Sequence, residues 1–135
     1  MICEMTVQMP EPQSKSYRIL VVDDEPSILR AYQMMLEFFG HQAEVTSGGH
    51  KALQMLDAKP FDLVITDYSM PGMKGDELIA EVRRRVPGLR IVMVTAFAED
   101  IQAAGNRTGG ADCILPKPFA IDDLRNTIAN LLAPA

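Results

Sequence analysis

Five short apolar runs of strand length alternate along this chain with segments whose apolar residues recur at helical spacing, and this alternation restricts the fold most. The runs lie within YRILVVDDE, AEVTS, DLVITD, RIVMVTA and DCILP. Strands that alternate with helices form a parallel sheet with right-handed crossovers. RIVMVTA is apolar almost throughout, as expected for a strand covered on both faces. The pattern predicts a doubly wound α/β fold with a five-stranded parallel sheet and five helices.

Proline and glycine mark the ends of the helical segments. The first begins at Pro26 and ends before Gly40, as helix start and stop signals predict. Three further helices are predicted over GHKALQML, GDELIAEVRRRV and IDDLRNTIANLL. A fifth, over residues 98–109, is weakened by Gly105 and Asn106. We expect that segment to be mobile and to become ordered on phosphorylation or partner binding, because it has few apolar anchors.

Length and charge narrow the class of protein. The chain has 135 residues and 47% hydrophobic residues, which predicts a flexible tail over 1–16 and one domain over 17–133. A net charge of −5 argues against nonspecific binding to nucleic acid or anionic membranes. Two cysteines form no disulfide framework, and we interpret Cys113 as a small buried hydrophobe. Without a signal peptide or a run long enough to span a bilayer, a cytoplasmic protein is predicted.

Polar side chains follow four of the predicted strands. Asp23 and Asp24 end the first strand, Asp67 ends the third, Thr95 ends the fourth and Lys117 follows the fifth. Either acid of the first strand alone is explained as a helix cap. The carboxyl ends of parallel strands meet at one edge, where such folds bind ligands, so the joint arrangement predicts a site.

The chemistry of these five residues points to phosphoryl transfer. Three carboxylates in one cleft repel one another unless a cation joins them, and a few hard oxygen ligands suit Mg²⁺. Aspartate is a phosphoryl acceptor, while Lys117 and the Thr95 hydroxyl can contact phosphoryl oxygens. The residues therefore predict a Mg²⁺-dependent phosphoaspartate site.

At these positions the chain resembles the receiver domain of two-component response regulators. The matching pieces are ILVVDDE, DLVITDYSMPGMKG, VTA and GADCILPKPF, and the similarity covers about residues 17–133. The resemblance implies a flavodoxin-like strand order, 2-1-3-4-5. It also implies a cis Lys117–Pro118 peptide, although cis bonds are a minority of X–Pro bonds.

The resemblance further implies a role for each site residue. Asp67 is the implied phosphorylation site, and Asp24 and Asp67 the implied Mg²⁺ ligands. Asp23 would act on the metal mostly through water, and the backbone carbonyl of Ser69 would be the remaining Mg²⁺ ligand supplied by the protein. Thr95 would be the switch hydroxyl, and Lys117 the family's lysine.

Two departures from the family concern switching and the lifetime of the phosphoryl group. Ile114 stands three residues before the lysine, where receivers commonly have Tyr or Phe, so either the switch works through Thr95 and loop motion or Ile114 simply packs in place of a ring. In the family, the residues two after the acceptor and two after the switch hydroxyl border the path of the hydrolytic water. By this resemblance they are Ser69 and Phe97, and neither is an acid or an amide. We expect slow self-dephosphorylation, with Phe97 shielding the site.

Other conspicuous residues have plain structural interpretations. The basic run 83–85 is expected to be a solvated helix C-terminus with favourable charge. His41 and His50 are expected to be exposed. Gly72 and Gly75 are expected to serve turn geometry.

These inferences combine into one function and one main alternative. The chain is predicted to be a stand-alone or excised receiver, without an output domain, that takes a phosphoryl group from a sensor histidine kinase or a phosphotransfer protein and controls an unknown downstream protein. It is expected to be a signalling domain rather than an enzyme, a monomer or weak dimer, with no direct nucleic-acid or membrane binding. The alternative is a phosphorylation-independent interaction module. An aspartate-based phosphatase is disfavoured because Ser69 stands where a general acid is wanted, and a flavin binder because the loop after the first strand is acidic.

Overall fold

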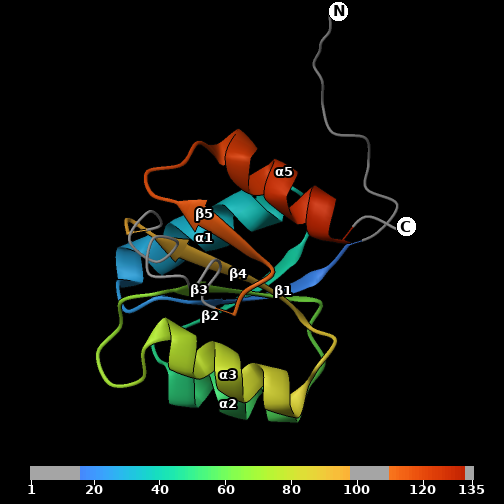
Figure 1. Cartoon of the computed structure of the whole chain (residues 1–135). Helices are drawn as coiled ribbons and strands as arrows, with labels where there is room; N and C mark the ends of the chain where they lie inside the picture. The colour runs from blue at the N-terminus through green and yellow to red at the C-terminus, as the bar shows by residue number, and fades with distance from the viewer. Residues whose placement is uncertain (1–15, 98–109, 133–135) are drawn as a thin grey trace, which may run out of the picture.

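The computed structural model describes residues 16–97 and 110–132, which form a parallel sheet between two layers of helices (Figure 1). The strands are β1 (Arg18–Val22), β2 (Gln42–Thr46), β3 (Leu63–Asp67), β4 (Arg90–Thr95) and β5 (Cys113–Pro116). The helices are α1 (Pro26–Phe38), α2 (Gly49–Ala58), α3 (Gly75–Arg85) and α5 (Ile121–Leu132). Figure 1 shows α1 and α5 on one face of the sheet and α2 and α3 on the other.

The sheet matches the prediction from the alternating pattern. All four strand pairs are parallel, and the strand order is β2-β1-β3-β4-β5. Four of the five expected helices lie within the described part of the chain. The remaining helix was expected over residues 98–109, which lie outside the described part of the chain. The expectation that this segment is mobile concerns the same residues and also falls outside it.

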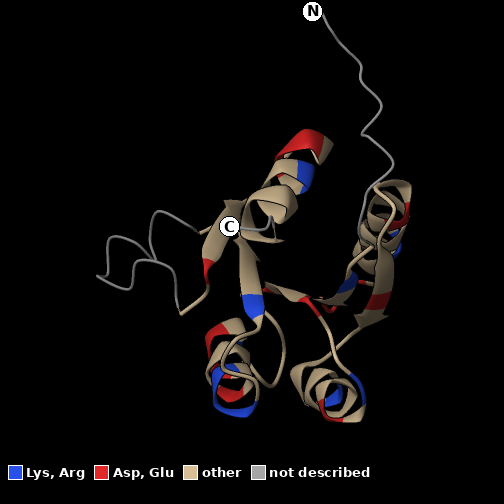
Figure 2. Cartoon of the chain, turned by 90° about the vertical axis from the view of Figure 1, so that its right-hand side faces the viewer, with Lys and Arg blue, Asp and Glu red and all other residues tan. Residues whose placement is uncertain are grey.

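The two faces of the central strands bury separate halves of the core. In β1, Leu20 and Val22 contact the α2–α3 side, whereas Ile19 and Val21 contact the α1–α5 side. All four side chains are at most 1% exposed. Charged residues lie mainly on the outer sides of the helices and at strand ends (Figure 2). Cys113 is only half-buried, less than predicted, because β5 is an edge strand.

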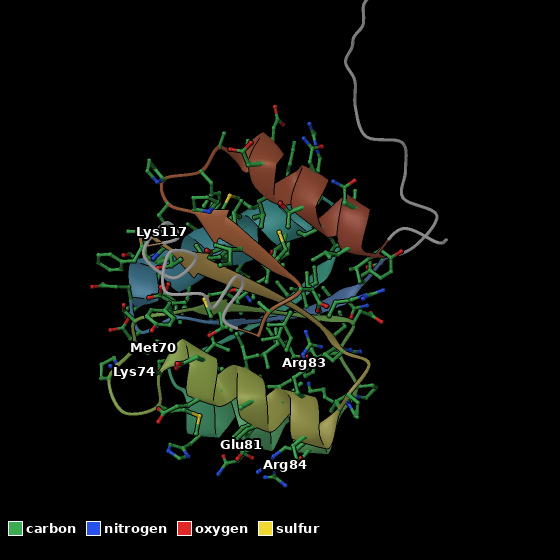
Figure 3. The ribbon with its side chains drawn as sticks, in the orientation of Figure 1. Met70, Lys74, Glu81, Arg83, Arg84 and Lys117 are labelled. Carbon is green, nitrogen blue, oxygen red and sulfur yellow. The ribbon has the colours of Figure 1, made fainter. Side chains whose placement is uncertain are left out.

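The sequence pattern predicted that the basic run at the end of α3 is solvated throughout, but the structure shows otherwise. Arg83 points toward the sheet (Figure 3) and donates to the Leu89 carbonyl at 2.8 Å, the Gly110 carbonyl at 3.2 Å and Asp112 Oδ2 at 2.9 Å. Arg84 pairs with Glu81 on the outer side of the helix, as a solvated face requires. The prediction was therefore wrong for Arg83, which joins α3 to the chain entering β5.

His41 is buried, which corrects the expectation that it is exposed. It is 9% exposed, and its Nδ1 accepts a hydrogen bond from the Tyr17 backbone N–H at 3.2 Å. The Tyr17 hydroxyl in turn donates to the Leu132 carbonyl at 2.9 Å. His41 thus helps to tie the entry of β1 to the ends of α1 and α5, while His50 is exposed as predicted.

Lowering the pH should destabilise the fold through His41. Burial lowers the pKa of His41 below its ordinary 6.5, and the nearby Asp62 charge only partly opposes this. The unfolded chain then binds a proton at a higher pH than the folded chain, so stability is lost as the pH falls through 6.5 toward the folded pKa. We expect the urea midpoint to drop between pH 8 and pH 5.5, and to drop less in His41→Gln. The matched control, His50→Gln, should keep the wild-type dependence; an equal slope in His41→Gln would contradict the assignment.

None of the helices in residues 16–97 and 110–132 is long and apolar enough to cross a membrane.

Candidate functional site

Three carboxylates converge where β1 and β3 end. These strands pair in register up to Val22 and Thr66, so the residues that follow are brought together at the same edge of the sheet. Each of Asp23, Asp24 and Asp67 offers a carboxylate oxygen within 4.8 Å of the others. The convergence predicted from the strand ends is therefore present.

Asp23 is the buried member of this acid cluster. It is 2% exposed, and its Oδ1 accepts a hydrogen bond from the Glu25 backbone N–H at 3.0 Å. Burial raises the pKa of Asp23; the charges of Asp67 and Asp24 raise it further, while the Glu25 N–H and Lys117 oppose the rise. The excess of negative charge is the electrostatic condition under which a divalent cation binds favourably.

Lys117 brings a positive charge to the cluster from the far side of β4. Its Nζ lies 3.4 Å from Asp67 Oδ1, and the carboxylate side chain is only 11% exposed. The Lys117 backbone N–H donates to the Thr95 carbonyl at 2.9 Å. The Lys117–Pro118 peptide is cis, which confirms that expectation. Figure 3 shows Lys117 near the end of β5.

Thr95 occupies the end of β4 between these groups. It is 2% exposed, and its Oγ1 accepts a hydrogen bond from the Phe97 backbone N–H at 2.9 Å. A hydroxyl that accepts through a lone pair keeps its own proton to donate. The Thr95 hydroxyl is therefore held in place and retains a proton for an oxygen ligand at this edge.

The loop after Asp67 depends on two glycines for different reasons. Gly72 has φ +82°, which confirms its role in a turn. Gly75 does not have a positive φ; instead, a Cβ added there would lie 2.6 Å from the Asp67 carbonyl oxygen and 2.8 Å from Tyr68 Cα. The turn interpretation of Gly75 is therefore wrong, because the residue permits close contact between α3 and the end of β3.

The residues at the two family departures differ in burial. Ile114 is partly buried and packs against the core on the α2–α3 side. Phe97 is 53% exposed. An isoleucine in a packed position is consistent with either interpretation of Ile114 given above.

Tyr32 belongs to the surroundings of the site, which sequence reasoning missed. Its helical spacing predicted only a core position, and it is indeed 3% exposed. However, its pKa is raised by burial and by the charges of Asp23 and Asp67, and it lines a cavity together with Lys117. A signal for this was available in the sequence. Side chains on a helix tilt toward its N-terminus, and the N-terminus of α1 follows Asp23 and Asp24 closely, so the Tyr32 phenol is directed toward the acids.

Sequence comparisons with known proteins find response regulators among the matches. The sequence profile described as the response regulator receiver domain matches residues 19–129. The transcriptional regulatory protein TcrA of Mycobacterium tuberculosis is 35% identical over 107 residues, covering 79% of this chain and 42% of TcrA. The response regulator MprA of Mycolicibacterium vanbaalenii is 33% identical over 115 residues, covering 85% of this chain and 50% of MprA. The chain thus spans about half the length of these relatives.

Solved structures agree with the sequence comparisons. The response regulator TrrA of Thermotoga maritima, crystallised in complex with Mg²⁺ and BeF, has a TM-score of 0.78 and 33% identity, covering 86% of this chain and 99% of the other. A CheY-like receiver domain of Methanospirillum hungatei has a TM-score of 0.80 and 31% identity, covering 87% and 94%. The similarity therefore covers almost all of the described residues.

Proposed function

Because this chain belongs to the response regulator receiver domain family, we propose that it accepts a phosphoryl group on Asp67 with Mg²⁺ and that the phosphorylated form controls a partner protein. The family is one of signalling domains, and its members are switched by phosphorylation. The observation that carries the proposal is the acid cluster with Lys117 3.4 Å from Asp67.

The donor set fits Mg²⁺. Three carboxylates at one edge match the few hard oxygen ligands that Mg²⁺ takes from proteins. Asp24 and Asp67 would hold the ion directly, Asp23 mostly through water, and the Ser69 carbonyl would complete the set. A bound Mg²⁺ supplies positive charge between the carboxylates and the phosphoryl oxygens. The Mg²⁺–BeF complex of TrrA supports this assignment by similarity.

Three side chains of the protein have separate roles in phosphoryl transfer. An Asp67 carboxylate oxygen attacks phosphorus, and the bond between phosphorus and the donor breaks with its electron pair leaving on the donor. Lys117 places its charge beside the phosphoryl oxygens, and the Thr95 hydroxyl donates to one of them. Positioning and charge stabilisation are the main sources of rate in phosphoryl transfer, so the domain assists its own phosphorylation without being an enzyme.

Partners are proposed from the family and the charge of the chain. The donor would be a sensor histidine kinase or a histidine phosphotransfer protein in the cytoplasm, and the recipient of the signal a downstream protein. Direct binding of this domain to nucleic acid is disfavoured by the net charge of −5. TcrA is a transcriptional regulatory protein, but that activity belongs to the longer relative. We propose a monomer or weak dimer.

Intact mass tests the proposal. We expect incubation with acetyl phosphate and Mg²⁺ to add one phosphoryl group, and chelation of Mg²⁺ to prevent the addition. If Mg²⁺ binds, as seen by calorimetry, but no adduct forms, the phosphorylation-independent module becomes the better account. Ile114 supports that alternative, whereas the complete acid cluster with Lys117 opposes it.

Self-dephosphorylation should be slow. Ser69 and Phe97 offer no acid or amide to orient a hydrolytic water, and Phe97 is expected to shield the phosphoryl group. We expect Phe97→Ala to hasten decay of the adduct by about tenfold or less, because an opened path for water still lacks the general base that contributes roughly 100-fold or more. Phe38→Ala, which removes another exposed ring, on α1, is the matched control. Equal decay rates in Phe97→Ala and the wild type would remove the shielding argument.

A further inference from the structure

An apolar cavity lies between α1 and the segment from Lys117 to Phe119. It has a volume of about 440 Å³, within the range of ordinary small-molecule pockets, roughly 300–1,000 Å³. Ile28, Ala31 and Met35 of α1 form one side, and Phe119 from the connection to α5 forms another. Such a lining suits an apolar group rather than a charged one.

Two aromatic residues line the cavity, Tyr32 and Phe119. Tyr32 and Phe119 pack with their centroids 6.0 Å apart and their planes 33° apart. Rings in this arrangement offer edges and faces on which another ring packs well. The cavity therefore favours a planar apolar occupant over a small aliphatic one.

Lys117 links the cavity to the acid cluster. Lys117 lines the cavity, and its Nζ lies 3.4 Å from Asp67 Oδ1. Ala96, which also lines it, directly follows Thr95. A molecule whose phosphoryl group contacts Lys117 thus binds next to an apolar cavity lined by the same residue. The charge of Lys117 complements the phosphoryl end, and the rings complement an aromatic one.

We propose that this cavity receives the leaving group of a small phosphodonor, so that the site favours aromatic acyl phosphates over acetyl phosphate. The inference rests on the proposed function and adds the class of donor. An Asp67 oxygen forms a bond to phosphorus, the bond from phosphorus to the bridging oxygen breaks, and the electron pair leaves on the acyl carboxylate. No proton or further reactant is needed. The aromatic carboxylate departs through the cavity lined by Tyr32 and Phe119.

The test compares benzoyl phosphate with acetyl phosphate as donors to the intact chain. Second-order rate constants for adduct formation are measured by intact mass with Mg²⁺ present. Ala31→Phe fills the cavity from an exposed position of α1, and Ala129→Phe places the same side chain on an exposed position of α5 as the control. Comparing the ratio of the two rate constants between variants cancels the intrinsic reactivity of the donors.

We expect the wild type and Ala129→Phe to prefer benzoyl phosphate about tenfold, from the apolar area that a ring buries beyond a methyl group. In Ala31→Phe the ratio of the two rate constants should fall about tenfold below the wild-type ratio, while the acetyl phosphate rate stays within about twofold of the wild type. A ratio in Ala31→Phe equal to that of the wild type, or an equal fall of the ratio in Ala129→Phe, overturns the cavity assignment and leaves the proposed function intact. Failure of both donors overturns both.

Discussion

We expect the replacement of Asp67 with Asn to abolish the proposed Mg²⁺-dependent phosphoryl adduct. The amide keeps the shape of the side chain but removes the nucleophilic carboxylate oxygen and one of the three charges of the acid cluster. Intact mass after incubation with acetyl phosphate should show no added phosphoryl group. Asp122→Asn, which removes one negative charge from an exposed position of α5, should be phosphorylated like the wild type.

The same variant should remain folded, which makes its inactivity interpretable. Asp67→Asn loses the ion pair with Lys117, but it also relieves the repulsion that raises the pKa of Asp23. Partly exposed ion pairs contribute up to about 1 kcal/mol, so the free energy of unfolding should change by no more than that. A folded Asp67→Asn protein that still gains a phosphoryl group would move the acceptor to another residue, with Asp24 the first to examine.

The sheet could be predicted from sequence because each strand carries its own signal. Strands buried on both faces are apolar runs, as Ile19 to Val22 and Ile91 to Val94 are, and short connections leave few alternative topologies. The polar strand ends were predictable for the same reason. Once the strands are parallel, Asp23, Asp67 and Thr95 must lie along one edge. The resemblance added the strand order and the cis peptide, which no periodicity encodes.

The errors concern contacts between segments distant in sequence. His41 follows a helix and looks like a surface residue, and its burial depends on Tyr17, 24 residues away. Arg83 sits in a basic run, and its carbonyl partner Gly110 is 27 residues on. Local pattern indicates which residues are polar, whereas tertiary packing decides which of them find a partner. Tyr32 was missed similarly, because helical spacing indicates a buried side and not the charges near it.

Gly75 gives the second large prediction, which joins the fold to the site. A Cβ at this position meets the Asp67 carbonyl oxygen at 2.6 Å, and the opposing atoms are backbone, so they cannot rotate away. We expect Gly75→Ala to cost about 2 kcal/mol of unfolding free energy, since overpacking costs roughly 1–3 kcal/mol and alanine's helix propensity returns only part of it. The loss should appear as a lower urea midpoint than that of the wild type.

The strain should also affect phosphorylation, because the backbone that must move is that of Asp67, the proposed acceptor. A shift of about 1 Å at reacting atoms costs on the order of 100-fold in rate, so we expect phosphorylation of the folded Gly75→Ala protein to slow by roughly 10- to 100-fold. Gly88→Ala is the matched control, since a Cβ there meets nothing within 4 Å, and it should keep both stability and rate. Equal behaviour of the two variants would mean that the end of β3 yields freely, and that the position of Asp67 is set by the acid cluster rather than by its contact with α3.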